Sequence, residues 1–203
     1  MAAVKQSSRY LDWQGYGVLG WLSVAALAFG AVIAATQERW WGAAWFVIAS
    51  LCVVAALYWL GKRVASVFYP LLGVALAVNI AGYTWDLFAT PGAYDEVVHG
   101  FTTAVIALAY GVIVFRRDAP NFVRHALLYF VAVATFGIAI AAVWEIVEWS
   151  LNQISGVSLL TGYSDTIWDL IADAGGALFA AVVCIATIAR HGRARHHPVN
   201  RVA

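Results

Sequence analysis

One histidine and several carboxylates occur at helical spacing within segments that are otherwise apolar. Asp95 and His99 are four residues apart, and Glu145 and Glu148 are three apart, so each pair shares one face of a helix. A histidine among oxygen ligands can bind a divalent cation or transfer a proton. The candidate catalytic residues are His99, Glu145 and Glu148. The candidate metal ligands are Asp95, His99, Glu145, Glu148, Asp165, Asp169 and Asp173.

The physics of helix ends separates the stronger candidates from the weaker ones. Glu145 and Glu148 stand near the end of their helix, where the helix dipole disfavours negative charge. Asp173 lies eight residues into its own helix, about 12 Å deep at 1.5 Å per residue, which is too far to cap the first turn. Asp95 and Asp165 have a simpler alternative role as caps of helix N-termini. For His99 the alternative is an ordinary hydrogen-bonded histidine near the membrane interface.

The composition is that of a membrane protein. Hydrophobic residues make up 63% of the chain and charged residues 11%, against about 25% charged in soluble domains. The apolar runs approach the roughly 20 residues that cross a bilayer as a helix. The first run lacks a signal-peptide cleavage site, so we expect an uncleaved first span.

These runs predict an all-α, polytopic integral membrane protein, folded as a compact bundle of six transmembrane helices. We expect one domain over residues 1–189 and a basic cytoplasmic tail over residues 190–203. The spans are expected at about 16–36, 40–60, 67–89, 94–115, 123–150 and 164–189.

The charged residues divide between the two sides of the expected membrane. Of the 12 Lys and Arg residues, only Arg39 falls on the side away from the termini. The positive-inside rule then places both termini in the cytoplasm, as expected for a bacterial plasma (inner) membrane protein. Nine of the 11 acidic residues fall on the outer side, namely Glu38, Asp86, Asp95, Glu96, Glu145, Glu148, Asp165, Asp169 and Asp173. A bound cation or protonation of the carboxyl groups would relieve their mutual repulsion.

The excess of oxygen ligands over histidine favours a hard divalent cation. Mn, Mg, Ca and Fe fit this ligand set better than structural zinc, which prefers Cys and His. Zinc remains open, because sites with one His and several carboxylates also bind it.

The same motifs resemble those of a bacterial family. Three motifs are similar to those of the YjdF-type inner-membrane family. They are Tyr94-Asp95 with His99, Glu145 with Glu148-Trp149, and the run from Gly162 to Gly176 that contains Asp165, Asp169 and Asp173. They also resemble, more remotely, the VanZ-like family of glycopeptide-resistance membrane proteins. The resemblance covers roughly residues 80–180. It implies a compact helical membrane protein and supports the grouping of the motifs, but it implies no particular reaction.

Three functions are compatible with these features. The first is a metal-dependent hydrolase or transferase that acts on lipid-linked substrates from the outer leaflet, with Glu145 or Glu148 as general base. The second is a non-catalytic membrane factor that binds ions, lipid headgroups or a partner. The third is an ion or proton transporter, which lacks a matching polar path in the inner half. Membrane lipids are the expected partners, nucleic acid is not expected, and protein partners are left open.

Overall fold

The computed structural model describes residues 15–60, 67–90, 92–155 and 163–196 of the 203-residue chain. Within these ranges every regular element is a helix, which confirms the all-α prediction. Contacts divide the chain into two compact units, residues 1–90 and 91–203, and each is described by itself. The single domain expected over residues 1–189 stays a prediction.

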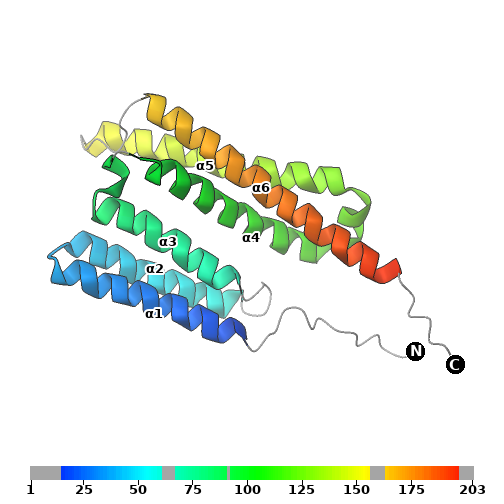
Figure 1. The fold of residues 1–203 in the computed structure, drawn as a ribbon, viewed down its shortest axis with the longest axis horizontal. Coiled ribbons are helices and arrows are strands. Elements are labelled where there is room, and N and C mark those ends of the chain that lie inside the picture. Colours follow the sequence, from blue (N-terminus) through cyan, green and yellow to red (C-terminus); the bar gives the residue numbers. More distant parts are fainter. Residues whose placement is uncertain (1–14, 61–66, 91, 156–162, 197–203) are drawn as a thin grey trace. The chain divides into compact units, whose positions relative to one another are not determined.

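Unit 1 contains three apolar helices and one short turn of helix. They are α1 (Gly15–Thr36), α2 (Trp40–Trp59), α3 (Phe68–Thr84) and the 3-10 helix η2 (Leu87–Ala89). The three long helices lie side by side (Figure 1). Their buried core consists of Leu27, Ala31, Ala34, Phe46, Ala49 and Val53.

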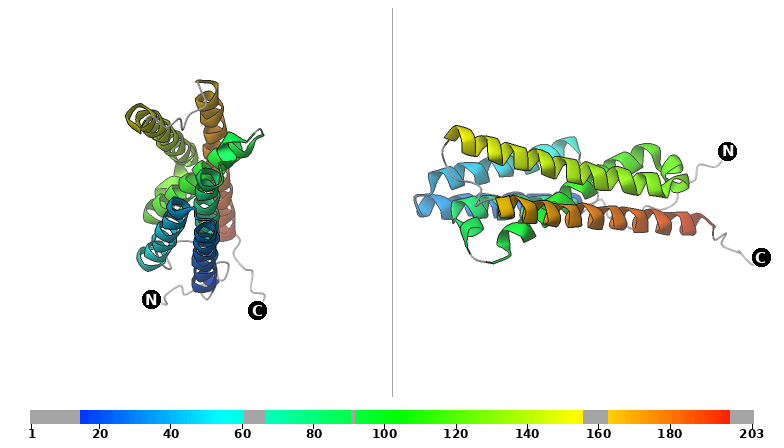
Figure 2. Two further views of the ribbon diagram at one scale, coloured as in Figure 1. Left: turned by 90° about the vertical axis from the view of Figure 1, so that its left-hand side faces the viewer. Right: turned by 90° about the horizontal axis from the view of Figure 1, so that it is seen from above.

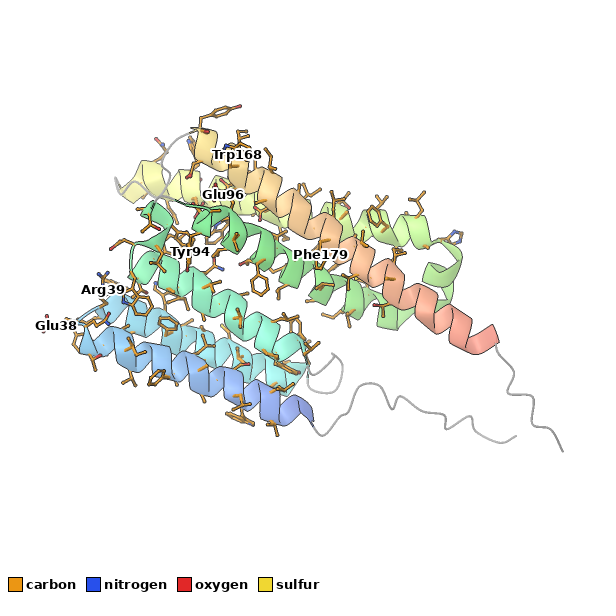
Figure 3. The ribbon with its side chains drawn as sticks, viewed as in Figure 1. Glu38, Arg39, Tyr94, Glu96, Trp168 and Phe179 are labelled. Carbon is orange, nitrogen blue, oxygen red and sulfur yellow. The ribbon has the colours of Figure 1, made fainter. Side chains whose placement is uncertain are left out.

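The basic residue expected on the outer side, Arg39, is partnered within unit 1. It lies in the turn between α1 and α2, together with Glu38 (Figure 3). Its guanidinium donates to the carbonyl oxygen of Thr84 and lies 3.4 Å from Oδ2 of Asp86. Asp86 is exposed and has φ of 56°, in the left-handed region. This acid therefore forms an exposed ion pair with Arg39.

Unit 2 is built from three long helices, α4 (Tyr94–Arg124), α5 (Ala126–Ser155) and α6 (Tyr163–His196). They run alongside one another, and the start of α4, the end of α5 and the start of α6 share one end of the unit (Figures 1 and 2). Successive helices run in opposite directions, so carboxylates far apart in sequence reach the same level (Figure 1). Their buried core consists of Ala107, Tyr129, Val133, Ala134, Ala180, Ala181 and Cys184.

Five of the six expected spans coincide with helices that are long and apolar enough to cross a membrane. The third is shorter, because α3 ends at Thr84 after 17 residues. Trp85 and the left-handed Asp86 separate it from η2, so the helix within the expected span of about 67–89 is interrupted. The six expected helices are nonetheless all present.

The ends of two other helices also differ from their expected positions. The apolar part of α4 ends at Val114, close to the expected 115, but the helix itself continues to Arg124. Arginine is a good helix former, so Arg116 and Arg117 end the apolar segment and not the helix. Similarly, α6 continues to His196, into the expected tail. Residues 197–203 and the expected boundary at Lys62-Arg63 lie outside the described residues.

Candidate metal site

Helix α4 presents three polar residues at a spacing of four. Asp95 lies in its first turn, and His99 and Thr103 follow one and two turns later. An acid in the first turn is favoured by the helix dipole, but a buried histidine and threonine below it need hydrogen-bond partners. Those partners come from the neighbouring helices.

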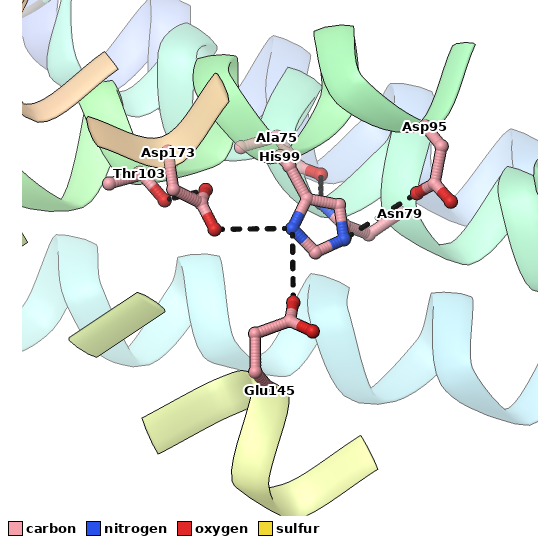
Figure 4. A network of polar contacts seen from close by, with 7 residues as sticks. All are labelled: Ala75, Asn79, Asp95, His99, Thr103, Glu145 and Asp173. Carbon is pink, nitrogen blue, oxygen red and sulfur yellow. Dashed lines mark hydrogen bonds and ion pairs between the residues drawn. The ribbon is translucent and has the colours of Figure 1, made fainter. Parts of the chain in front are cut away.

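Asp173 of α6 accepts a hydrogen bond through each of its carboxylate oxygens. The hydroxyl of Thr103 donates to Oδ1 over 2.5 Å, and Nδ1 of His99 lies 3.3 Å from Oδ2 (Figure 4). Only 2% of Asp173 and 9% of His99 are exposed. The deep aspartate therefore links two successive turns of α4 to α6.

The other ring nitrogen of His99 faces Asp95. Nε2 lies 3.5 Å from Oδ1 of Asp95, at the opposite side of the ring from Asp173 (Figure 4). Asp95, His99 and Asp169 each place one potential ligand atom within 4.8 Å of the other two. This spacing suits three ligands of one ion.

Helix α5 places two buried glutamates near the same histidine. His99, Glu145 and Glu148 also place one ligand atom each within 4.8 Å of one another. Oε1 of Glu145 lies 3.8 Å from Nδ1 of His99, beyond hydrogen-bonding distance. The two groups of three therefore overlap at His99.

Glu145 is buried without hydrogen bonds. Only 6% of the residue is exposed, and among the described residues neither Oε1 nor Oε2 has a hydrogen-bond partner. The hydroxyl of Thr166 lies nearby without completing a hydrogen bond. An unsatisfied buried polar group costs about 1–3 kcal/mol, and more when it is charged. Such a carboxylate points to a ligand.

Two glycines allow α4 and α6 to approach closely enough for these contacts. A Cβ added to Gly176 would collide with the carbonyl oxygen of Gly100, and one added to Gly100 would lie 2.9 Å from the carbonyl oxygen of Ala172. Gly100 directly follows His99, and Gly176 comes three residues after Asp173. The helix contact is therefore tightest where the histidine meets the aspartate.

Below the polar groups, the three helices are packed with small apolar residues. Gly137 of α5 faces Ala107 of α4 and Ala177 of α6, and both alanines are fully buried. No Asp, Glu, His, Lys or Arg occurs in residues 104–115, 126–144 or 174–189. The polar cluster thus occupies one end of unit 2.

The structure brings five of the seven predicted ligands into the two groups of three, namely Asp95, His99, Glu145, Glu148 and Asp169. Asp165 is half-buried and outside both groups, although its charge acts on Asp95 and Asp169. Asp173 is also outside both groups.

Sequence reasoning did not select Thr103 or Glu96. Thr103 has a signal in the sequence, since it continues the four-residue spacing from Asp95 and His99. Glu96 is half-buried, and its Oε2 has no hydrogen-bond partner among the described residues (Figure 3). Because Glu96 directly follows Asp95, a role in the first turn of the helix was enough to explain it from the sequence.

Comparison with known proteins identifies a family but no characterised relative. No curated protein and no solved structure matches the chain. A family model described as "Predicted membrane protein (DUF2238)" matches residues 17–190, which include all six helices except the ends of the first and last. The match is consistent with the resemblance to the YjdF-type family, while the link to VanZ-like proteins stays a resemblance. This multi-pass membrane protein belongs to the DUF2238 family.

Proposed function

We propose that the end of unit 2 binds a divalent cation and that the bound cation serves a hydrolase or transferase acting on lipid-linked substrates. The ligands would come from Asp95, His99, Glu145, Glu148 and Asp169, with Asp165 beside them. The observation that carries the proposal is Glu145, a buried carboxylate that has no hydrogen-bond partner and lies 3.8 Å from His99.

A cation accounts for this carboxylate better than a proton does. A protonated Glu145 would need an acceptor for its O–H, and neither of its oxygens has a hydrogen-bond partner among the described residues. No Lys or Arg occurs between Arg63 and Arg116 or between Arg124 and Arg190. A basic side chain from these segments therefore cannot neutralise the acids. The mixture of one imidazole and several carboxylates suits Mn, Mg, Ca, Fe or Zn.

The surroundings of the cluster support a substrate at the lipid headgroup level. Trp144, Trp149 and Trp168 lie next to Glu145, Glu148 and Asp169 in sequence, and all three indole groups are exposed. Figure 3 shows Trp168 on the outside of α6. Tryptophan is enriched at the interface between lipid and water. We place this interface on the outer side of a bacterial plasma membrane, with both termini in the cytoplasm, because the Lys and Arg residues concentrate on the side of the termini.

The proposed chemistry needs a nucleophile and a base. A bound cation would activate a coordinated water and stabilise negative charge on the substrate. Glu148 or Glu145 would accept the proton from the attacking group, since both are buried beside His99. His99 would hold the cation.

The packing below the cluster supports access from one side only. The alanines at positions 107, 177, 180 and 181 are fully buried, and ion conduction through unit 2 would require a polar path in their place. We therefore prefer a binding or catalytic site to a transporter.

The experiment measures metal content and lipid products together. The full chain is purified in detergent after growth with trace metals, and bound ions are quantified by mass spectrometry. Wild type should retain about one divalent ion per chain, and Glu145→Gln should retain far less, with Glu38→Gln as control at an exposed site. Membranes from cells producing wild type or Glu148→Gln are then compared by lipid mass spectrometry. A metal-free wild type would overturn the proposal. A metal-loaded wild type with unchanged lipids would indicate a non-catalytic cation-binding factor.

A further inference from the structure

Two buried carboxylates next to His99 differ in their hydrogen bonding. Asp173 accepts one hydrogen bond on each oxygen, from Thr103 and from His99. Glu145 accepts none among the described residues. Both residues belong to the set of ligands expected from sequence, but their environments suit different roles.

With Asp173 ionised, its hydrogen bond with His99 requires a proton on Nδ1 of the ring. A carboxylate oxygen is an acceptor, so Nδ1 must be the donor in the 3.3 Å contact with Oδ2. In the neutral ring, Nε2 then has the free lone pair. Nε2 faces Asp95 at 3.5 Å, and Asp95 and Asp169 form a group of three with His99.

We infer that Asp173 is a positioning residue and not a metal ligand. It holds His99 as the tautomer protonated on Nδ1, so that Nε2 binds the cation together with Asp95 and Asp169. Glu145, which approaches the ring at Nδ1, would then reach the cation from outside this group of three. Thr103 in turn holds Asp173 through Oδ1. Histidines that bind metals usually donate their other N–H to a carboxylate or carbonyl group, which fixes both the tautomer and the ring orientation. The inference rests on the proposed cation site and assigns Nε2 as the nitrogen of His99 that binds the cation.

Three features of the fold favour this arrangement. Thr103 and His99 are one turn apart on α4, so a single carboxylate can accept from both. The close approach at Gly100 and Gly176 brings α6 near enough for these bonds. Finally, Asp173 is 2% exposed, and its burial holds the carboxylate in one orientation.

The first test reads the tautomer directly in the unmodified protein. The full chain, labelled with 15N in histidine, is placed in phospholipid nanodiscs and titrated with 113Cd. Signals of His99 are those that disappear in His99→Asn. We expect a proton on Nδ1 and coupling of 113Cd to Nε2. Coupling of the metal to Nδ1 would overturn the inference.

The second test measures affinity for Mn and Cd in matched variants. Asp173→Asn should weaken binding by about 10- to 100-fold, as typical for loss of a residue that orients a ligand, and should reduce the preference of Cd for Nε2. Asp169→Asn should weaken binding further, because it removes a ligand. Asp86→Asn, the same substitution at an exposed aspartate, should leave the affinity unchanged. Equal losses in Asp173→Asn and Asp169→Asn would make Asp173 a ligand, and an unchanged affinity in Asp173→Asn would remove it from the site.

The outcomes separate this inference from the proposed function. If wild type binds neither Mn nor Cd, both fail. If wild type binds Cd through Nδ1, the cation site stands and only the role of Asp173 is wrong. If size-exclusion chromatography shows that Asp173→Asn does not fold, the ring nitrogen that couples to Cd in wild type still tests the role of Asp173.

Discussion

Glu145 and Asp173 approach the same nitrogen of His99 from two helices, but only Asp173 makes a hydrogen bond to it. Oδ2 of Asp173 lies 3.3 Å from Nδ1, and Oε1 of Glu145 lies 3.8 Å from it. The aspartate is fully hydrogen-bonded, whereas the glutamate has no hydrogen-bond partner among the described residues. We therefore expect Glu145 to lower the stability of protein without a bound cation and Asp173 to raise it.

Replacing Glu145 with Met is expected to stabilise the metal-free protein and to weaken cation binding. The substitution roughly keeps the size of the side chain and removes two polar atoms that have no hydrogen bond among the described residues. The gain should be about 1–3 kcal/mol, or roughly 2–4 °C in melting temperature for each kcal/mol. Thermal unfolding in detergent with EDTA measures it. Glu38→Gln, at an exposed acid, should shift the melting temperature little. A lower melting temperature for Glu145→Met in EDTA would contradict the account of Glu145.

A divalent cation should stabilise the wild type and EDTA should reverse the effect. Binding at 100 times the dissociation constant contributes about 2.7 kcal/mol. The melting temperature is followed during titration with Mn or Mg, alongside His99→Asn, which lacks the histidine shared by both groups of ligands. The variant should show little shift. Equal shifts in the two proteins would assign the stabilisation to binding elsewhere.

The neighbouring glycines of α6 should respond in opposite ways to replacement by alanine. In Gly176→Ala the new methyl group would meet the backbone of Gly100, so α4 and α6 must separate. The expected cost is about 1–3 kcal/mol, together with weaker metal binding. In Gly175→Ala nothing lies within 4 Å of the new methyl group, and helix propensity should raise stability by roughly 0.5–1 kcal/mol. Denaturant or thermal unfolding distinguishes them. Similar effects at both positions would show that close helix contact does not limit the site.

Replacing Asp86 with Asn, which tolerates the left-handed backbone at this position, should leave cation affinity unchanged. Asp86 forms an exposed ion pair with Arg39, and such pairs contribute about 0.2–1 kcal/mol. The expected result is a small loss of stability, measured by thermal unfolding, with unchanged Mn affinity. A tenfold loss of affinity would instead include Asp86 among the ligands.

Local sequence patterns were sufficient to predict the helices and the set of candidate ligands. Apolar runs of membrane length predicted the five long helices, because crossing a bilayer depends on length and hydrophobicity, which each segment carries by itself. The spacing of Asp95 and His99, and of Glu145 and Glu148, predicted shared faces because an α-helix repeats every 3.6 residues. The expectation that Glu145 and Glu148 lie near a helix end is wrong, because α5 continues to Ser155 and the helix dipole acts only within the last turn.

The roles within that set were decided only by tertiary structure. Asp173 and Glu145 are both acids deep in apolar helices. No local pattern shows that Asp173 accepts a hydrogen bond from Thr103 and that Glu145 has no hydrogen-bond partner among the described residues. Asp86 resembled the other outer acids until the fold brought it to Arg39, 47 residues away in the chain. Hydrogen bonds and ion pairs of this kind depend on distances between helices. Packing sets those distances, as at Gly100 and Gly176, and they cannot be predicted from the spacing of residues along one helix.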